Sequence, residues 1–378
     1  MNLQSPYFIG IMSGTSTDGV DASLVKITQE EPNAVQLIAT SSLDIPISLR
    51  EAILRLNKSG PDELRLAAQV SLELGKLYAD VSQNLLLEND LLADNINALG
   101  IHGQTVRHRP EHGYSIQLNA PALVAELTGI DVISDFRSRD IAAGGQGAPL
   151  IPAFHHAIFR DNTQGRSLLN IGGISNLSLL QPEGPTIGFD CGPGNMLLDY
   201  WCHKHLGEKF DLDGRWGATG KIDEGLLDFL ITSENWLKLQ PPKSTGRDLF
   251  NGQWLEEKLD TFFELHPETS TYKAADIQAT LVAFTVNCIV TCLNDYAKDS
   301  KELIVFGGGA ANPEIMTQLS AALNYPVRTS DALGIPTQTM ESMAFAWLAW
   351  AFRQRLPICT PEMTGARHAN VAGSLHPA

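Results

Sequence analysis

The sequence predicts an α/β protein made of two similar domains, each built on a mixed β-sheet. Three observations predict this fold. A glycine-bearing strand–turn–strand segment opens each half of the chain, apolar stretches alternate between strand and helix periodicity, and a strand–glycine–helix element follows near the end. A chain of 378 residues with 43% hydrophobic and 19% charged residues is long enough for two such domains.

The two strand–turn–strand segments occupy residues 7–27 and 167–180. In the first, an apolar run ends at Ser-Gly-Thr-Ser-Thr-Asp-Gly, residues 13–19, before a second apolar run begins. In the other, an apolar run ends at Gly-Gly-Ile-Ser-Asn, residues 172–176. Because the two segments lie about one domain length apart, they predict an internal duplication of the fold.

Helical and extended patterns alternate between and after these segments. We expect further strands at residues 96–106, 114–118, 131–134, 186–190 and 303–306. We expect helices at residues 61–89, 121–128, 148–159, 195–205, 274–298 and 340–355. The polar segment 160–166 is the best candidate boundary, so the predicted domains are residues 1–162 and 163–378.

The charge balance excludes several classes of partner. The chain has 27 basic and 43 acidic residues, a formal net charge of -16, and no cluster of Lys or Arg. This argues against a nucleic acid or an anionic membrane as partner. A phosphate-bearing ligand would then be held by backbone N–H groups, a metal and a few placed cations, which the 32 glycines favour.

The sequence also indicates a compartment. The N-terminus has no basic region followed by a long apolar core, and the apolar run at 281–293 is interrupted by polar residues. We therefore expect that run to be a buried core helix. Five cysteines without a CxxC pair fit neither a disulfide framework nor a zinc site, so a reducing cytoplasm is the expected location.

The turn of the first hairpin has the chemistry of a phosphate-binding loop. Its small residues let successive N–H groups converge, Thr15 and Ser16 add hydroxyl donors, and Asp18 could position a hydrated magnesium ion. A ligand-free β-turn of the same composition is the alternative. A Walker loop is excluded because there is no GK[ST] and a strand follows the turn.

Three glycine-rich elements together point to a superfamily. The turn of the second hairpin carries Gly172, Gly173 and Asn176, and the strand at 303–306 leads to a further group of residues that comprises Gly307, Gly308, Gly309 and Asn312. Asn312 is the expected N-cap of the next helix. The arrangement is similar to the actin, hexokinase and Hsp70 superfamily, whose two RNase H-like domains flank a nucleotide cleft. That resemblance implies that the two hairpins bind the phosphates of the nucleotide and that the late glycines pack on its adenosine.

Asp190 is the candidate catalytic base. It ends a predicted strand immediately before Cys-Gly-Pro-Gly, where its carboxylate could face a ligand and the glycines allow a close approach. An Asp in such a place is also a common turn or helix-start residue. Within the frame of two phosphate hairpins, the catalytic role is the better interpretation.

Eight segments resemble, in order, the motifs of the anhydro-N-acetylmuramic acid kinase family. They are GIMSGTSTDGVDASLV, IHGQTVRH, DFRSRDIAAGGQGAPLIPAFHHAIF, LLNIGGISNLSLL, FDCGPGNMLLDYW, PPKSTGRDLFN, VFGGGAANPEIM and MESMAFAWLAW. The resemblance spans almost the whole chain. It implies a cytoplasmic enzyme of peptidoglycan recycling that uses ATP and magnesium, acts as a homodimer, and gives N-acetylmuramic acid 6-phosphate and ADP.

The resemblance also implies roles for particular residues. The family's catalytic aspartate corresponds to Asp190, and Cys191 departs from the expected Thr beside it. The nucleotide segment corresponds to Gly14, Thr15, Ser16, Thr17, Asp18, Gly19, Val20 and Asp21. The sugar-binding neighbourhood corresponds to His102, Gln104, Thr105 and Arg137, with Glu341 a further candidate.

Arg137 is the candidate partner of the sugar's lactyl carboxylate, because a planar guanidinium can bind a carboxylate with two hydrogen bonds. Arg247, in the loop at 241–247, fits either a ligand contact or a structural ion pair.

Two other classes of protein remain as alternatives. A nucleotide-driven chaperone or filament protein would have both hairpins but no need of the sugar-facing segments. A glycosidase would need a pair of carboxylates and no nucleotide.

Overall fold

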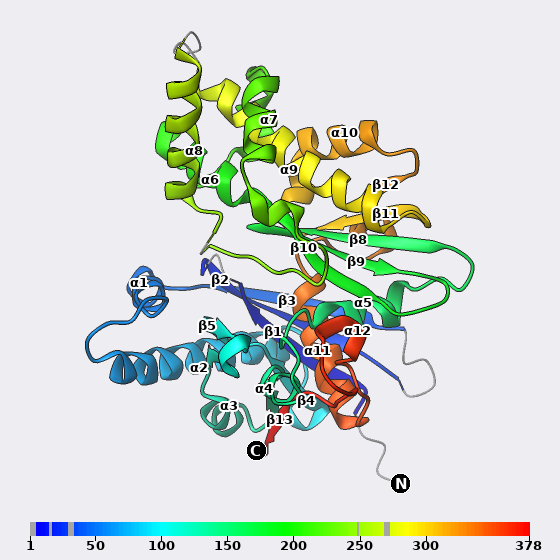
Figure 1. Ribbon diagram of the computed structural model, residues 1–378. Coiled ribbons are helices and arrows are strands. Elements are labelled where there is room, and N and C mark those ends of the chain that lie inside the picture. Colours follow the sequence, from blue (N-terminus) through cyan, green and yellow to red (C-terminus); the bar gives the residue numbers. More distant parts are fainter. Residues whose placement is uncertain (1–4, 15–16, 29–33, 248, 268–272) are drawn as a thin grey trace. The chain divides into compact units, whose positions relative to one another are not determined.

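The structure is a computed structural model that describes residues 5–14, 17–28, 34–247, 249–267 and 273–378. It contains two compact units (Figure 1). Unit 1 comprises Met1–Ile158 and Thr339–Ala378, and unit 2 comprises Phe159–Gln338.

Unit 1 is built on a six-stranded mixed sheet. Its strands are β1 (Tyr7–Ser13), β2 (Gly19–Lys26), β3 (Gln36–Asp44), β4 (Ile96–Ile101), β7 (Val132–Ser134) and β13 (Ser374–His376), with a separate hairpin of β5 (Gln104–Arg109) and β6 (Tyr114–Leu118). Its helices are α1 (Ile47–Arg55), α2 (Glu63–Glu88), α3 (Pro121–Thr128), α4 (Ser138–Ala142), α5 (Ile151–Phe159), α11 (Met340–Arg353) and α12 (Pro361–Thr364). Short 3-10 turns lie at Ala93–Asn95 and Pro110–His112.

The strand order in unit 1 is β13-β7-β4-β1-β2-β3. β2 is antiparallel to both β1 and β3, whereas β4 is parallel to β1 and β7 is parallel to β4. The first two expected strands therefore form the predicted hairpin, β1 and β2.

Both faces of this sheet are covered. Ile9 and Ile11 of β1 belong to the core cluster that includes Leu74 and Tyr78 of α2. Gly10 lies between them and faces α11, because residues alternate across a strand. The orange-red helix α11 in Figure 1 thus comes from the end of the chain to pack on the first strands.

Two glycines allow α11 to approach the sheet closely. A Cβ atom added to Gly10 would lie 1.9 Å from the carbonyl oxygen of Ser342, and one added to Gly100 would lie 2.0 Å from that of Phe345. Backbone atoms cannot yield as a flexible side chain can. The position of α11 therefore depends on the absence of a side chain at both sites.

We expect Gly100→Ala to lower the free energy of unfolding by about 3 kcal/mol, because the added methyl must push the backbone of α11 away from β4. Urea denaturation measures this difference. Gly60→Ala is the matched control, since a Cβ at Gly60 meets nothing within 4 Å. Equal stability of the two variants would contradict the close packing of α11.

Unit 2 is built on a five-stranded mixed sheet. Its strands are β8 (Gly165–Ile171), β9 (Ile174–Leu180), β10 (Ile187–Pro193), β11 (Ser300–Phe306) and β12 (Val327–Thr329). Its α-helices are α6 (Asn195–Leu206), α7 (Glu224–Thr232), α8 (Gly252–Leu265), α9 (Ala274–Tyr296) and α10 (Pro313–Ala322). Short 3-10 turns lie at Leu212–Gly214, Gly217–Thr219, Asn235–Lys238, Gly308–Ala311 and Ser330–Leu333.

Unit 2 repeats the topology of unit 1. Its order is β10-β9-β8-β11-β12, with β9 antiparallel to β8 and β10, β11 parallel to β8, and β12 parallel to β11. In both units, the first three strands form an antiparallel meander and two parallel strands extend it beyond the first. The predicted duplication of an RNase H-like α/β domain is confirmed.

The expected buried helix at 281–293 is also confirmed. It lies within α9, which by length and composition alone could cross a membrane. However, 78% of its most apolar window is buried inside unit 2, and its side chains join the main hydrophobic cluster there. Among the described residues, all five cysteines are free and buried.

Two predictions about organisation need correction. Residues 339–378, predicted to belong to the second domain, pack with unit 1, because α11 covers its sheet. The strand expected at 96–106 is two strands, β4 and β5, since Gly103 between them has φ +77°. Three further elements were not expected from the sequence: β3, a half-buried strand, and the helices α7 and α8.

Candidate functional site

Asp190 lies in the middle of β10 and not at its end as predicted, because the strand continues to Pro193. A β-bulge follows Asp190 directly. Asp190 pairs with Asn176 of β9, but the next pair is Gly192 with Ser175, so Cys191 has no opposite partner. Gly192 has φ +153°, and a Cβ there would lie 3.1 Å from Cys288. A bulge bends a strand and redirects its side chains, as often happens near active sites.

A row of polar side chains crosses the sheet at this level. Asp190 of β10 is paired with Asn176 of β9, which is paired in turn with Asn170 of β8. All three are half-buried, and none belongs to the hydrophobic cluster of unit 2. Directly opposed residues share a face of the sheet, so these three side chains form one polar row. Asn170 was not predicted as a site residue.

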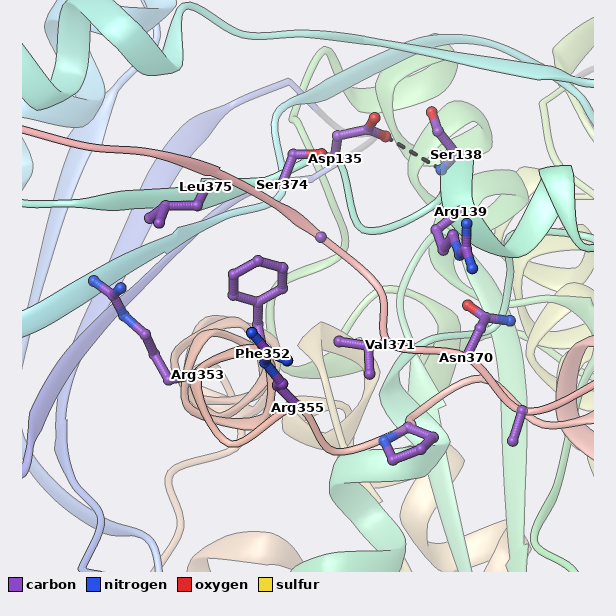
Figure 2. A pocket seen from close by; sticks show the side chains of 13 residues that line it. Asp135, Ser138, Arg139, Phe352, Arg353, Arg355, Asn370, Val371, Ser374 and Leu375 are labelled. Atoms are coloured by element: carbon purple, nitrogen blue, oxygen red, sulfur yellow. Dashed lines mark hydrogen bonds between the residues drawn. The ribbon is translucent and has the colours of Figure 1, made fainter.

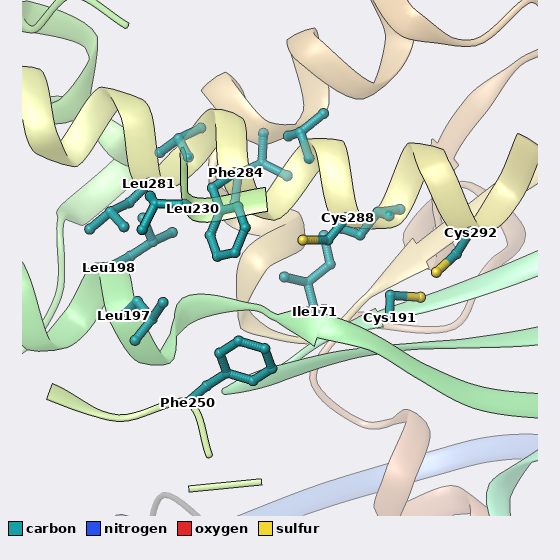
Figure 3. Packing of buried hydrophobic residues seen from close by; sticks show 14 of the residues in the cluster. Ile171, Cys191, Leu197, Leu198, Leu230, Phe250, Leu281, Phe284, Cys288 and Cys292 are labelled. Carbon is teal, nitrogen blue, oxygen red and sulfur yellow. The ribbon is translucent and has the colours of Figure 1, made fainter. Parts of the chain in front are cut away.

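Cys191, the residue after Asp190, is buried in the core of unit 2. Figure 3 shows its sulfur directed toward Cys292 of α9, with Cys288 nearby, in the hydrophobic cluster of unit 2. Burial raises the pKa of the Cys191 thiol well above its usual range. The cysteine therefore acts as a small buried residue in the core.

The carboxylate of Asp190 has a defined surrounding. Its Oδ2 accepts hydrogen bonds from the N–H of Thr245 at 2.8 Å and from the hydroxyl of Ser244 at 3.1 Å. Burial raises the pKa of Asp190 to about 6, although these two donors and the charge of Lys243 lower it. Such a group is ionised at neutral pH yet accepts a proton readily, as a general base must.

The turn of the second hairpin holds the start of α6. The carbonyl oxygen of Gly173 accepts from the N–H of Gly194 at 2.9 Å, and that of Gly172 accepts from the N–H of Asn195 at 2.8 Å. Asn195 also donates through its side chain to the carbonyl oxygen of Ile171 at 3.2 Å. The hairpin turn and the start of α6 are therefore one structure.

The late glycine group lies beside this turn. Gly307 has φ +82°, and a Cβ there would lie 2.3 Å from the side chain of Asn170. A Cβ at Gly308 would lie 3.5 Å from the side-chain nitrogen of Asn195. Unit 2 thus brings together Asp190, the second turn and the late glycines. The full set is Asp190, Gly172, Gly173, Asn176, Gly307, Gly308 and Gly309.

Asn312 is the N-cap of α10, as predicted. Its Oδ1 accepts from the N–H groups of Glu314 at 3.0 Å and Ile315 at 3.4 Å, and Pro313 occupies the first helical position. Its side-chain oxygen is thus engaged in the cap.

The turn of the first hairpin is described only in part, because Thr15 and Ser16 lie outside the described residues. Gly14 and Thr17 flank them, and the N–H of Thr17 donates to the carbonyl oxygen of Gly14 at 3.1 Å. Thr17 adopts a left-handed conformation, φ +57°. A left-handed residue turns successive N–H groups to one side, which suits anion binding.

The acidic residues after this turn are already engaged. Asp18 forms an ion pair with Arg50 at 3.1 Å, and Asp21 accepts from the hydroxyl of Ser42 at 2.8 Å. Gly19, Val20 and Asp21 are the first residues of β2. Among the described residues, no group of three His, Cys, Asp or Glu side chains could hold a metal ion. The two carboxylates are thus held by Arg50 and Ser42.

The predicted sugar-facing residues lie next to this first turn. The N–H of His102 donates to the carbonyl oxygen of Ile11 at 3.1 Å, and the side chain of Gln104 donates to that of Gly14 at 3.4 Å. The Oε1 atom of Gln104 is buried without a hydrogen-bond partner. Thr105 accepts from Gln117 at 3.2 Å. Gln104 thus presents an unsatisfied acceptor beside the turn.

Arg137 and His102 form a hydrogen-bonded pair. Nη2 of Arg137 donates to Nε2 of His102 at 2.9 Å, and Nη1 donates to the carbonyl oxygen of Gly147 at 2.6 Å. Burial and, to a lesser extent, the charge of Arg137 together lower the pKa of His102 to about 3. Burial lowers the pKa of Arg137 to about 10, opposed in part by Glu341 of α11. At neutral pH, His102 is therefore neutral and Arg137 is charged.

Asp140, which was not predicted as a site residue, organises the loop that follows α4. It is fully buried and accepts from the N–H of Gly147 at 2.7 Å and from the hydroxyl of Thr364 at 2.7 Å. A Cβ at Gly145 would lie 2.3 Å from this carboxylate. Asp140 thereby fixes Gly147, whose carbonyl oxygen holds Arg137.

The predicted residues thus form two groups, one in each unit. None of them lines the cavity that is shown in Figure 2. It measures about 950 Å³ in unit 1 and is lined by residues that include Arg139, Arg355 and Asn370 (Figure 2).

The sequence matches the anhydro-N-acetylmuramic acid kinase family over residues 6–378. The chain belongs to this family. A relative named anhydro-N-acetylmuramic acid kinase from Bordetella petrii is 50% identical over 371 residues, which cover 98% of this chain and 96% of the relative. One of the same name from Pseudomonas paraeruginosa is 47% identical over 374 residues, 99% of each chain. This kinase family makes the chain an ATP-using carbohydrate kinase, so the resemblance inferred from the motifs is confirmed.

Solved structures show a more distant similarity to this kinase. An activator of 2-hydroxyisocaproyl-CoA dehydratase from Clostridium difficile with bound ADPNP is 12% identical, with a TM-score of 0.48 over 92% of this chain and 96% of that chain. A ROK family glucokinase from Streptomyces griseus in complex with glucose and AMPPNP is 11% identical, with a TM-score of 0.40 over 90% and 98%. Neither similarity bears on the ligands of this chain.

Proposed function

We propose that this kinase opens the 1,6-anhydro bond of 1,6-anhydro-N-acetylmuramic acid and phosphorylates the released oxygen. The products would be N-acetylmuramic acid 6-phosphate and ADP. Family membership supports the substrate. The observation that carries the mechanism is the carboxylate of Asp190, which is held at one oxygen and has a pKa raised by burial to about 6.

Asp190 is the general base of this reaction. It takes a proton from a water molecule whose oxygen attacks carbon 1 of the sugar, and the bond between carbon 1 and the bridging oxygen breaks. The bridging oxygen, now on carbon 6, attacks the γ-phosphorus of ATP and ADP leaves. Each bond that forms is thus matched by one that breaks.

The remaining residues bind and orient the two substrates. Arg137 pairs with the lactyl carboxylate, because each of its Nη groups keeps a second hydrogen beyond those given to His102 and Gly147. Gln104 offers its unpartnered Oε1 to a sugar hydroxyl or amide. His102, Thr105 and Glu341 complete the sugar neighbourhood.

Backbone N–H groups of the glycine-rich turns bind ATP. In unit 1 these are residues 14–21, and in unit 2 they are the second turn and the late glycines, with Asn312. Mg²⁺ would accompany the triphosphate and neutralise its charge, with Asp18 contributing through water.

We also propose a cytoplasmic homodimer that works in peptidoglycan recycling. Five free, buried cysteines suit a reducing compartment, and the acidic net charge of -16 suits a protein without a nucleic-acid or membrane partner. Sedimentation of the purified chain measures the oligomeric state, and a monomer at micromolar concentration would contradict the dimer.

The oxygen atoms of the product test the mechanism directly. In ¹⁸O-water, we expect label at the anomeric oxygen of the first product and none in the phosphate, because water attacks carbon 1 and the bridging oxygen takes the phosphoryl group. The bridge shields one face of the sugar, so the first anomer should be α. Early-time NMR and mass spectrometry measure both. Label in the phosphate, or an initial β anomer, would refute the coupled mechanism.

A further inference from the structure

The loop at 241–247 lies along the outer edge of β10. The N–H of Asp190 donates to the carbonyl oxygen of Lys243 at 3.0 Å, and β10 is the edge strand of its sheet. An edge strand has unpaired backbone groups, and this loop satisfies one of them at the catalytic residue. The loop and the base are therefore joined through the backbone.

Two donors of the loop converge on a single oxygen of Asp190. The N–H of Thr245 and the hydroxyl of Ser244 both reach Oδ2, at 2.8 and 3.1 Å. In the described part of the chain, no hydrogen bond reaches Oδ1. Two donors on one oxygen fix the rotation of the carboxylate and leave the other oxygen with its lone pairs available.

Lys243 adds a buried positive charge. Lys243 is only 8% exposed. Its Nζ donates to the carbonyl oxygen of Leu237 at 3.1 Å and lies 4.6 Å from the ring centre of Trp236. The indole N–H of Trp236 also donates to the carbonyl oxygen of Ser244 at 3.2 Å. One tryptophan thus anchors both the cation and the hydroxyl-bearing residue.

We propose that Lys243, Ser244 and Thr245 form a clamp that positions Asp190, with Oδ2 held by the loop and Oδ1 directed to the attacking water. This inference rests on the proposed role of Asp190 as base. The three residues act through the carboxylate and touch no substrate. They are positioning residues, and the loop that carries them lies about 50 residues beyond Asp190 in the sequence.

The clamp has a consequence for pH dependence. A base works when it is deprotonated, so activity should fall as the pH drops through the pKa of Asp190. Burial raises this pKa, and the Ser244 hydroxyl, the Thr245 N–H and the Lys243 charge lower it to about 6. Removing any of these contacts raises the pKa, so the acidic limb of the activity profile moves to higher pH.

Ser244→Ala tests the clamp, because this exposed serine can lose its hydroxyl without a cavity. We expect the pH at which kcat/KM falls on the acidic side to move up by about one pH unit. This is the shift in pKa that the loss of one charge-assisted hydrogen bond causes. Ser244→Thr keeps the hydroxyl and should restore the limb. Thr261→Ala is the matched control, since it removes an exposed hydroxyl of α8 that donates to the carbonyl oxygen of Glu257 within the same helix.

Carboxyl ¹³C NMR of Asp190 measures the same shift without turnover. If Ser244→Ala leaves both the acidic limb of the activity profile and the carboxyl pKa of Asp190 unchanged, the clamp is overturned. This holds even if Asp190→Asn is inactive. If Asp190→Asn is active and its kcat/KM shows the same pH dependence as the wild type, the role of Asp190 as base is overturned instead. The two failures are therefore distinguishable.

Discussion

Asp190→Asn is expected to lower kcat by a factor of about 10² to 10⁴, because the amide keeps the shape of the side chain but cannot take a proton from water. The amide oxygen can still accept from the Thr245 N–H, so the fold around β10 should persist. The affinity for ATP should change little. Steady-state ADP release with the anhydro sugar, together with nucleotide binding by calorimetry, measures both quantities.

The pH profile makes this prediction specific. Wild-type kcat/KM should rise about tenfold per pH unit below pH 6 and level off above it, because the pKa of Asp190 is raised to about 6. In Asp190→Asn this limb should vanish. Asp260→Asn removes an exposed carboxylate of α8 and serves as control. Near-normal turnover by Asp190→Asn would remove this residue from the chemistry.

Arg137→Met is expected to lower kcat/KM for the anhydro sugar about 100-fold, the effect of losing roughly 3 kcal/mol from a carboxylate–guanidinium pair. This loss in kcat/KM should occur only with a sugar that carries the lactyl carboxylate. With 1,6-anhydro-N-acetylglucosamine, which lacks the lactyl group, wild type and variant should differ much less. The ratio of kcat/KM for the two sugars is therefore the quantity to compare, because a general loss of folding would lower both values equally.

Arg139→Met provides the matched control for this experiment. Arg139 lies two residues further along, is exposed, and lines the cavity of Figure 2 with no predicted site residue. Its loss should leave the ratio for the two sugars unchanged. A fall that is the same for both sugars in Arg137→Met would mean that Arg137 only supports His102 and Gly147.

Local patterns in the sequence predicted those features that depend on neighbouring residues. The helix expected at 121–128 is α3 with the same bounds, and the N-cap at Asn312 holds the first N–H groups of α10. One glycine-bearing hairpin opens each unit, as predicted. Helix periodicity, capping and turns involve residues within about four positions of one another, so a single sequence displays them.

Other features escaped prediction because they join distant residues. The sequence around Gly10 and Gly100 does not predict that α11, more than 200 residues later, packs on them. The same holds for Asp140, whose partner Thr364 lies 224 positions away.

The sequence by itself determined the duplicated α/β fold, the family and the identity of the candidate base. Only the tertiary structure decided which oxygen of Asp190 is held, that Arg137 pairs with His102, and which unit receives the end of the chain. Hydrophobic periodicity and turn chemistry act over a few residues, and the motifs can be read in one dimension. The direction of the Asp190 carboxylate depends instead on a β-bulge and on a loop some 50 residues away in the sequence. The bulge and the loop come together only when the whole unit is packed.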